Sequence, residues 1–107
     1  MRNDVITLIA QTYALNDYGV QIPTETTRDI FCDVKSISQR EFYAAGESGL
    51  KPELRFDVFA YDYNGEKLIE HNGNRYFVYR TYQASNNVLE LYTERKVGTE
   101  WPDPNEK

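Results

Sequence analysis

The residues best suited to chemistry are few in this chain of 107 residues. His71 is the only histidine and Cys32 the only cysteine, so a metal site with two imidazoles and an internal disulfide are both excluded by count. His71 precedes the turn sequence Asn72-Gly73, which favours a solvated histidine beside a hairpin. Cys32 lies in an alternating apolar segment and is typical of a small buried hydrophobe. Neither residue is predicted to act as a nucleophile or a metal ligand.

Three carboxylates, Asp57, Asp62 and Glu66, fall close to one predicted hairpin, and clustered oxygens can bind a divalent ion. No supporting base or further ligand accompanies them, so solvated strand faces explain these carboxylates better. The segment Gly46-Glu47-Ser48-Gly49 lacks the context of a nucleophile elbow, and no phosphate-binding glycine loop or Cys-x-x-Cys motif occurs. We therefore expect no enzymatic activity and no cofactor.

Surface recognition has more support, because aromatic residues make up 14% of the chain. Phe42 and Tyr43 follow Arg40 in a predicted helix, and Trp101 lies in a proline-held tail. Large aromatic side chains with arginine nearby anchor many protein interfaces. The alternative, that Phe42 covers one end of the fold, stays open.

The element that would position Phe42 and Tyr43 interrupts a pattern of strands. Ser38 and Glu41 have the spacing of a reciprocal capping box, which predicts a helix beginning here. Gly46 is expected to end that helix in the left-handed conformation, and Gly49 and Pro52 prevent regular structure before the next strand. An insertion of this length, residues 38–53, is usually functional or mobile in a small β domain.

Alternating apolar residues predict six strands around this insertion. They cover residues 5–13, 28–37, 54–62, 67–71, 75–82 and 88–95. In the second of these, Ile30, Cys32 and Val34 are expected to point inward, with Phe31 and Ile37 under the insertion.

Three further patterns concern turns and edges. Pro23 keeps residues 21–24 out of a central strand and leaves a loop or an edge. Asn64-Gly65 predicts a type I′ hairpin between residues 54–62 and 67–71, and a second Asn-Gly follows at 72–73. The strand over 75–82 is aromatic on both faces, so it is buried on both or meets a partner.

The predicted fold is one domain, mainly β: a small antiparallel β-barrel of about six strands with a long loop that carries one short α-helix. A sandwich is the alternative, and closure is favoured because it removes exposed strand edges. Residues 1–98 form the barrel domain, and residues 99–107 form an extended tail.

Charge and hydropathy limit the partners. Acidic residues outnumber basic ones 17 to 12, for a net charge of −5, so no general affinity for phosphate backbones is expected. A β-barrel that binds single-stranded nucleic acid through stacking tyrosines is the second functional hypothesis. The chain has neither a signal-peptide pattern nor an apolar run long enough to span a membrane, so a cytoplasmic protein without membrane contact is expected.

Several segments, in their order along the chain, resemble one protein family. The segments are residues 40–46 (Arg-Glu-Phe-Tyr-Ala-Ala-Gly), 49–53 (Gly-Leu-Lys-Pro-Glu), 62–66 (Asp-Tyr-Asn-Gly-Glu), 74–82 (Asn-Arg-Tyr-Phe-Val-Tyr-Arg-Thr-Tyr) and 89–92 (Leu-Glu-Leu-Tyr). Together they are similar to the head–tail joining proteins of long-tailed phages and prophages, with a likeness that extends from Met1 to Gly98.

The resemblance implies a structural connector of the head-completion or stopper type, present in the virion and, during assembly, in the host cytoplasm. Its copies form a ring beneath the portal and adaptor, help close the DNA channel after packaging, and provide the tail's docking surface. DNA passes through without sequence recognition, and no cofactor is needed. Residues 38–53 would be the assembly loop. The predicted interface residues are Arg40, Glu41, Phe42, Tyr43, Leu50, Lys51 and Trp101.

Overall fold

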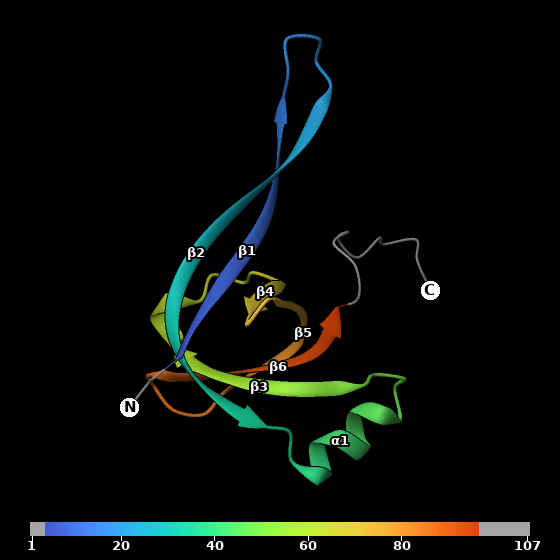
Figure 1. Ribbon diagram of the computed structural model, residues 1–107, viewed down its shortest axis with the longest axis vertical. Coiled ribbons are helices and arrows are strands. Elements are labelled where there is room, and N and C mark those ends of the chain that lie inside the picture. The colour runs from blue at the N-terminus through green and yellow to red at the C-terminus, as the bar shows by residue number, and fades with distance from the viewer. Residues whose placement is uncertain (1–3, 97–107) are drawn as a thin grey trace.

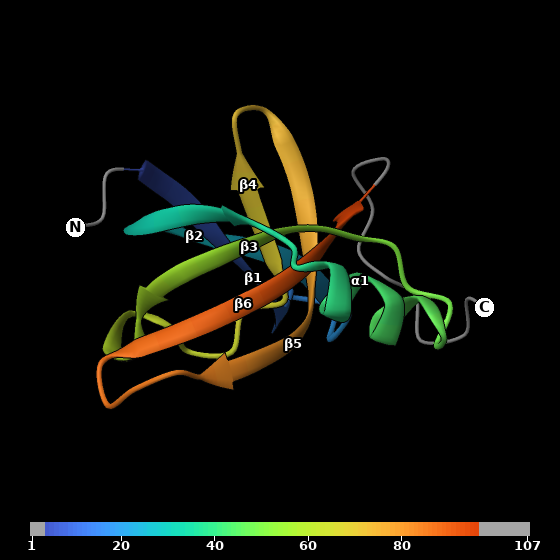
Figure 2. The ribbon, with the colours of Figure 1, turned by 90° about the horizontal axis from the view of Figure 1, so that it is seen from below.

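The computed structural model describes residues 4–96, which form a closed antiparallel barrel with the strand order β1-β2-β3-β6-β5-β4 (Figures 1 and 2). One short helix, α1, interrupts the strands, and a single 3-10 turn, η1, follows β3. The predicted fold class is confirmed. The elements are β1 (Asp4–Leu15), β2 (Gln21–Ser36), α1 (Gln39–Gly46), β3 (Pro52–Phe59), η1 (Ala60–Asp62), β4 (Leu68–His71), β5 (Asn74–Gln83) and β6 (Val88–Lys96).

The barrel interior is filled by alternate residues from all six strands, as a half-buried antiparallel strand requires. Phe56 is fully buried and contacts the ring of Tyr76 edge-on at a centroid distance of 5.6 Å. Cys32 is fully buried, which confirms its prediction as a small core residue. The core cluster comprises Ile6, Leu8, Ile30, Cys32, Phe56, Val58, Ile69, Tyr76, Val78 and Leu91.

The predicted hairpin at Asn64-Gly65 is wrong. β3 pairs with β2 and β6, whereas β4 pairs with β1 and β5, so the chain crosses from one side of the barrel to the other between them. A type I′ turn needs positive φ at both central residues. Gly65 has it and Asn64 does not, but Asn72 (φ 51°) and Gly73 (φ 80°) both do, and they join β4 to β5.

The segment after β3 is held by side chains instead of a hairpin ladder. Arg28 donates to the carbonyl of Asp62 (2.6 Å) and to the carboxylate of Glu66 (2.7 Å), which also accepts the Asn64 N–H (2.9 Å). The expectation of solvated carboxylates is wrong for Glu66 and for Asp57, because each is only 9% exposed and paired with an arginine. His71 is half-buried rather than solvated, with its ring 5.5 Å from that of Phe56.

Phe31 does not lie under the insertion, contrary to the prediction. It is 61% exposed, because it alternates with the inward-facing Ile30 and Cys32 and therefore points out of the barrel. Ile37 is half-buried beside the start of α1, which packs against β3.

Candidate interaction surfaces

Helix α1 begins where the sequence predicts it. The Ser38 hydroxyl accepts the Glu41 N–H at 3.1 Å, and Ala45 is the buried residue of the helix. The other half of the predicted capping box, a bond from the Ser38 N–H to the Glu41 carboxylate, is wrong. That carboxylate turns toward the barrel instead. The helix does end at Gly46, but the left-handed residue is Gly49 (φ 83°), three residues later. Between them the backbone forms two overlapping turns, in which Ser48 N–H donates to the Ala45 carbonyl and Gly49 N–H to the Gly46 carbonyl.

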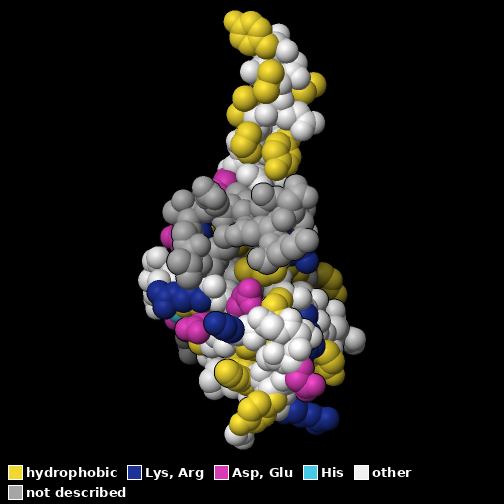
Figure 3. Space-filling model, turned by 90° about the vertical axis from the view of Figure 1, so that its right-hand side faces the viewer, with side chains coloured by type: hydrophobic (Ala, Val, Ile, Leu, Met, Phe, Trp, Pro, Cys, Tyr) yellow, Lys and Arg dark blue, Asp and Glu magenta, His cyan; other side chains and the backbone are white. Residues whose placement is uncertain are grey.

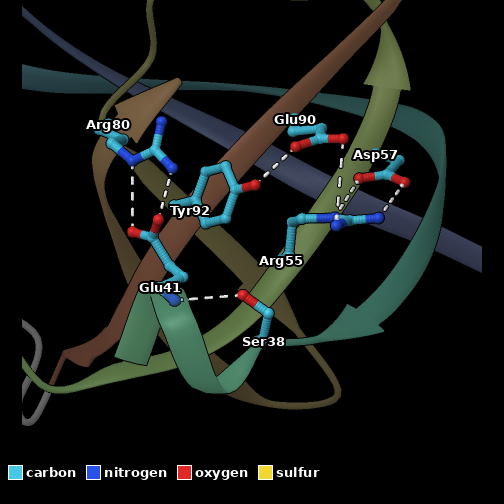
Figure 4. A network of polar contacts seen from close by, with 7 residues as sticks. All are labelled: Ser38, Glu41, Arg55, Asp57, Arg80, Glu90 and Tyr92. Carbon is cyan, nitrogen blue, oxygen red and sulfur yellow. Dashed lines mark hydrogen bonds and ion pairs between the residues drawn. The ribbon is translucent and has the colours of Figure 1, made fainter. Parts of the chain in front are cut away.

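The Glu41 carboxylate is the main polar link between α1 and the barrel (Figure 4). It accepts the Tyr79 hydroxyl at 2.8 Å and both the Nε and Nη2 groups of Arg80. The Glu41 side chain is 12% exposed, and its hydrogen bond from Arg80, aided by that from Tyr79, lowers the pKa of the carboxyl group. We call this contact of Glu41 with Tyr79 and Arg80 the clamp; at neutral pH its carboxylate is ionised.

A β-bulge explains how two consecutive residues reach one carboxylate. In a regular strand Tyr79 and Arg80 would point to opposite faces. The register of β5 against β6 shifts between Val78 and Arg80, which leaves Tyr79 as an extra residue. The bulge re-aims the side chains, and both meet Glu41.

The clamp continues into a network across β6 and β3. The Arg80 guanidinium lies 4.1 Å from the centre of the Tyr92 ring, and the Tyr92 hydroxyl donates to Glu90 at 2.6 Å. Arg55 in turn pairs with Asp57 (2.8 Å) and lies 3.9 Å from Glu90. Figure 4 shows these side chains next to one another above the start of α1, over β6 and β3. Within this network, α1 is joined to the barrel by the bonds of Glu41 to Tyr79 and Arg80.

Two aromatic side chains of α1 are exposed to solvent. Phe42 is 47% exposed and Tyr43 is 66% exposed, and their rings meet edge-on at 6.1 Å. Arg40 and Lys51 are exposed, and Leu50 is half-buried after the helix. The structure therefore brings Phe42 and Tyr43 together as one surface, while Glu41 faces the barrel. Trp101 and the predicted tail lie outside the described residues.

A second surface was not predicted. The β1–β2 ladder runs to the pair Leu15↔Gln21, but β1 contacts β4 only over Thr7–Ile9, and β2 contacts β3 only over Cys32–Ser36. Residues 10–27, here called the arm, therefore project from the barrel as a two-stranded ribbon (Figure 1). Pro23 sits inside β2, so of the two predicted alternatives the edge strand is the one observed.

Side chains at the end of the arm are apolar and exposed, as Figure 3 shows along the projection. We call them the tip patch: Tyr13 (60%), Leu15 (69%), Tyr18 (89%), Val20 (55%) and Ile22 (44%). The tip patch covers both faces of the ribbon, because Ile22 pairs with Ala14 and therefore faces away from Tyr13 and Leu15. The turn between the strands is ordered by Asn16, whose Oδ1 accepts the N–H groups of Tyr18 and Val20 at 2.9 Å each. Apolar alternation on both sides of residues 16–19 was the sequence signal for this arm.

One salt bridge joins the base of the arm to the barrel. Arg75 of β5 lies 3.2 Å from the carboxylate of Glu25. Just outside the arm, Thr7 of β1 donates to Asp29 of β2 at 2.7 Å, which links the two strands of the ladder to each other.

No group of three or more His, Cys, Asp or Glu side chains within residues 4–96 is arranged to hold a metal ion. In the same part of the chain, no helix is long and apolar enough to cross a membrane.

No protein-family model matches the chain, and no curated protein matches it in sequence.

Proposed function

We propose that this protein is a structural connector subunit of a virus particle, of the head–tail joining kind. The observation that carries the proposal is that one small barrel presents two separate apolar surfaces, on α1 and on the arm. A subunit that joins a ring and also receives another component needs two different surfaces. The resemblance of residues 40–46, 49–53, 62–66, 74–82 and 89–92 to head–tail joining proteins adds separate support.

In this role, copies of the chain form a ring beneath the portal and adaptor, help close the DNA channel after packaging, and offer a docking surface to the tail. The role is structural rather than catalytic, with the protein in the virion and, during assembly, in the host cytoplasm. The net charge of −5 supports passage of DNA through the ring with little adhesion.

Nucleic-acid binding by stacking tyrosines has less support. Tyr76 and Tyr92 are buried, at 5% and 8% exposure, and Tyr92 is already covered by Arg80. Such a function also predicts affinity that falls steeply as salt is added. Binding of a single-stranded oligonucleotide at low salt, measured by fluorescence anisotropy, would favour this alternative.

The proposed function is tested in the phage or prophage that encodes the chain. Deleting the gene should leave DNA-filled heads without tails, as counted by negative-stain electron microscopy. Replacing it with the double variant Phe42→Ala, Tyr43→Ala should lower the number of tailed particles at least about tenfold, because central aromatic anchors each contribute about 2 kcal/mol or more.

The matched control changes exposed polar residues at the two ends of α1, Gln39→Ala with the C-cap change Glu47→Ala, and should give normal tailed particles. The purified aromatic variant should unfold within a few degrees of the parent chain, since Phe42 is only about half buried and Tyr43 is mostly exposed. Tailed particles from the deletion strain would overturn the proposed function. Tailed particles from the aromatic variant alone would overturn only the role of α1.

A further inference from the structure

Three apolar side chains form a row on the outer face of the barrel, across β1, β4 and β5. Ile9 pairs directly with Leu68, and Leu68 pairs directly with Phe77. Residues next to them along the strands, Leu8 and Ile69 among others, belong to the core cluster. Alternation therefore points the three side chains away from the barrel interior. We call Ile9, Leu68 and Phe77 the outer row.

Two members of the outer row are buried although they face outward. Ile9 is 1% exposed and Leu68 is 0% exposed, while Phe77 is half-buried. An apolar side chain on the outside of a barrel is buried only where another part of the molecule covers it. Among the helices and strands described within residues 4–96, the only broad packing outside the ladders is that of α1 on β3, which carries no residue of this row.

The salt bridge between Arg75 and Glu25 crosses the same face and supplies part of the cover. In the ladders Arg75 is level with Thr7, two residues before Ile9, whereas Glu25 is level with Gln11, two residues after it. The ion pair therefore spans the outer row. The Arg75 side chain is itself only 23% exposed, so a further segment has to cover both this side chain and the row.

We propose that this segment is residues 97–107, which cross the outer face of β5 and β4 and place Trp101 on Leu68 and Ile9. The described chain ends at Lys96, which pairs with Arg75 beside the row. Adjacent strands lie about 4.8 Å apart, so the path from β6 across β5 and β4 to β1 measures roughly 14–15 Å. Five extended residues span about 16–18 Å, and Trp101 is the fifth residue after Lys96.

The composition of residues 97–107 fits a strap across the strands better than a further strand of the barrel. Pro102 and Pro104 lack the N–H group that a strand ladder needs. Trp101 is the largest apolar side chain of the segment, and an aromatic side chain of this kind buries about 150–250 Å². In this arrangement Trp101 contacts the barrel of its own chain, whereas the sequence alone predicts a contact with a partner.

Apolar burial rather than charge holds the strap. Glu25 and Glu70 both lie within ion-pair distance of Arg75, and residues 97–107 carry three acidic residues and one lysine. Charge therefore does not draw the segment to this face, and the burial of Trp101 has to do so. Because salt screens like charges, added salt should leave the contact intact.

The fluorescence of Trp101 tests the contact in the full chain, because this residue is the only tryptophan. Its emission should lie at a shorter wavelength than that of a free peptide with the sequence of residues 97–107, and acrylamide should quench it less. Both differences should persist when salt is added. Emission and quenching equal to those of the peptide would overturn the proposal.

Photocrosslinking locates the contact. Benzoylphenylalanine at position 101 keeps an aromatic side chain, and mass spectrometry of a mixture of isotopically labelled and unlabelled chains separates crosslinks within a chain from those between chains. The expected product joins position 101 to Ile9, Leu68 or their neighbours on the outer face of the same chain. Crosslinks to α1, to the tip patch or to a second copy would overturn the proposal, and so would the absence of any crosslink.

Two substitutions measure what the strap contributes to stability. Trp101→Ala should lower the unfolding temperature by at least about 4 °C, the shift that the loss of one ordinary contact gives in a domain of this size, and Trp101→Phe should restore most of it. Asn105→Ala, a polar change in the same segment, is the matched control and should leave the temperature unchanged. An alanine variant as stable as the parent chain would show that Trp101 does not cover the row.

This inference does not depend on the proposed function. Fluorescence and crosslinking are measured on the purified chain, whereas the function is measured by tail joining in particles. Failure of the strap therefore leaves the proposed function standing, and tailed particles from the gene deletion would remove the function without changing the fluorescence.

Discussion

The helix α1 and the arm both present apolar side chains to solvent, but they are held in place by different forces. α1 is linked to the barrel mainly by one carboxylate, which bonds to Tyr79 and Arg80, and by the burial of Ala45. The arm is held by a continuous ladder of backbone hydrogen bonds and by its Asn16 turn. The position of α1 therefore depends mainly on the charge of one side chain, whereas the arm combines a backbone ladder with the Arg75–Glu25 salt bridge at its base.

This difference implies that the two surfaces can respond separately. Local opening of α1 needs the loss of a few side-chain contacts while the barrel stays closed. Separating the two strands of the arm breaks backbone pairs that have no substitute except water. We expect α1 to detach from the barrel more readily than the two strands of the arm separate from each other.

The largest expected effect comes from removing the clamp with Glu41→Ala. The change leaves the Tyr79 hydroxyl and the Arg80 guanidinium without their acceptor, and we expect a loss of about 1–2 kcal/mol in the free energy of unfolding. The estimate is modest because the Arg80 side chain is 42% exposed and water replaces part of the loss. Chemical denaturation measures the change.

Hydrogen exchange locates the same effect. In Glu41→Ala the amides of residues 39–46 should exchange faster, while those of the arm should keep their rates. Glu47→Ala, which changes an exposed glutamate at the end of the same helix, is the control and should leave α1 protected. Equal protection of α1 in the parent chain and in Glu41→Ala would show that the clamp does not hold the helix.

The barrel could be predicted from the sequence because its pattern is local. Alternation places Ile6, Phe56 and Leu91 on inward faces, and closure follows from the need to cover strand edges. The arm could not be predicted in the same way. Its strands contribute no residue to the core, and Pro23 is typical of a strand end. β2 extends to Gln21 because its backbone pairs with β1, and this pairing leaves only a weak pattern in the sequence.

The clamp shows the same limit at the level of single residues. Ser38 was predicted as the cap because the partner N–H is three residues away. The partners of Glu41 are 38 and 39 residues away, and they converge on it only because a bulge inserts Tyr79 into β5. No local sequence pattern marks a bulge at this position, so the carboxylate was predicted to bond to its own helix.

A smaller loss of folding stability is expected at low pH. The pKa of Glu41 is lowered in the folded protein, so the unfolded chain takes up a proton more readily than the folded one. The stabilisation is complete above the ordinary pKa of 4.5 and is lost as the pH falls through the lower, folded value. Glu66 acts in the same direction, since hydrogen bonds from Arg28 and backbone N–H groups outweigh the effect of its burial.

The variant Glu41→Gln separates these contributions, because glutamine keeps an acceptor but cannot ionise. Its stability should fall less than that of the parent chain between neutral pH and pH values below 4.5, with the residual slope due to Glu66 and other carboxylates. Denaturation midpoints measured across this range test the prediction. An identical slope in both proteins would mean that Glu41 is not linked to folding.

The smallest expected effect comes from paired glycine substitutions, one in each region. Gly19, in the turn of the arm, has a φ of 77°, and a Cβ there would meet no atom within 4 Å, so Gly19→Ala acts through backbone strain alone. That strain is about 1–2 kcal/mol, which corresponds to a roughly 5- to 30-fold rise in exchange of nearby amides such as that of Val20. Because the tip can open by itself, the free energy of global unfolding should fall by less than about 1 kcal/mol.

Gly46→Ala makes the same chemical change in α1 and should have the opposite sign. Gly46 is the last helical residue, has no positive φ, and has open space where a Cβ would lie. Alanine should therefore stabilise the helix by about 0.5–1 kcal/mol and slow its amide exchange. If both substitutions act in the same direction, α1 and the arm tip do not differ in backbone conformation as described. If Gly19→Ala instead speeds exchange in α1, the two surfaces are coupled and the separate response inferred for them is wrong.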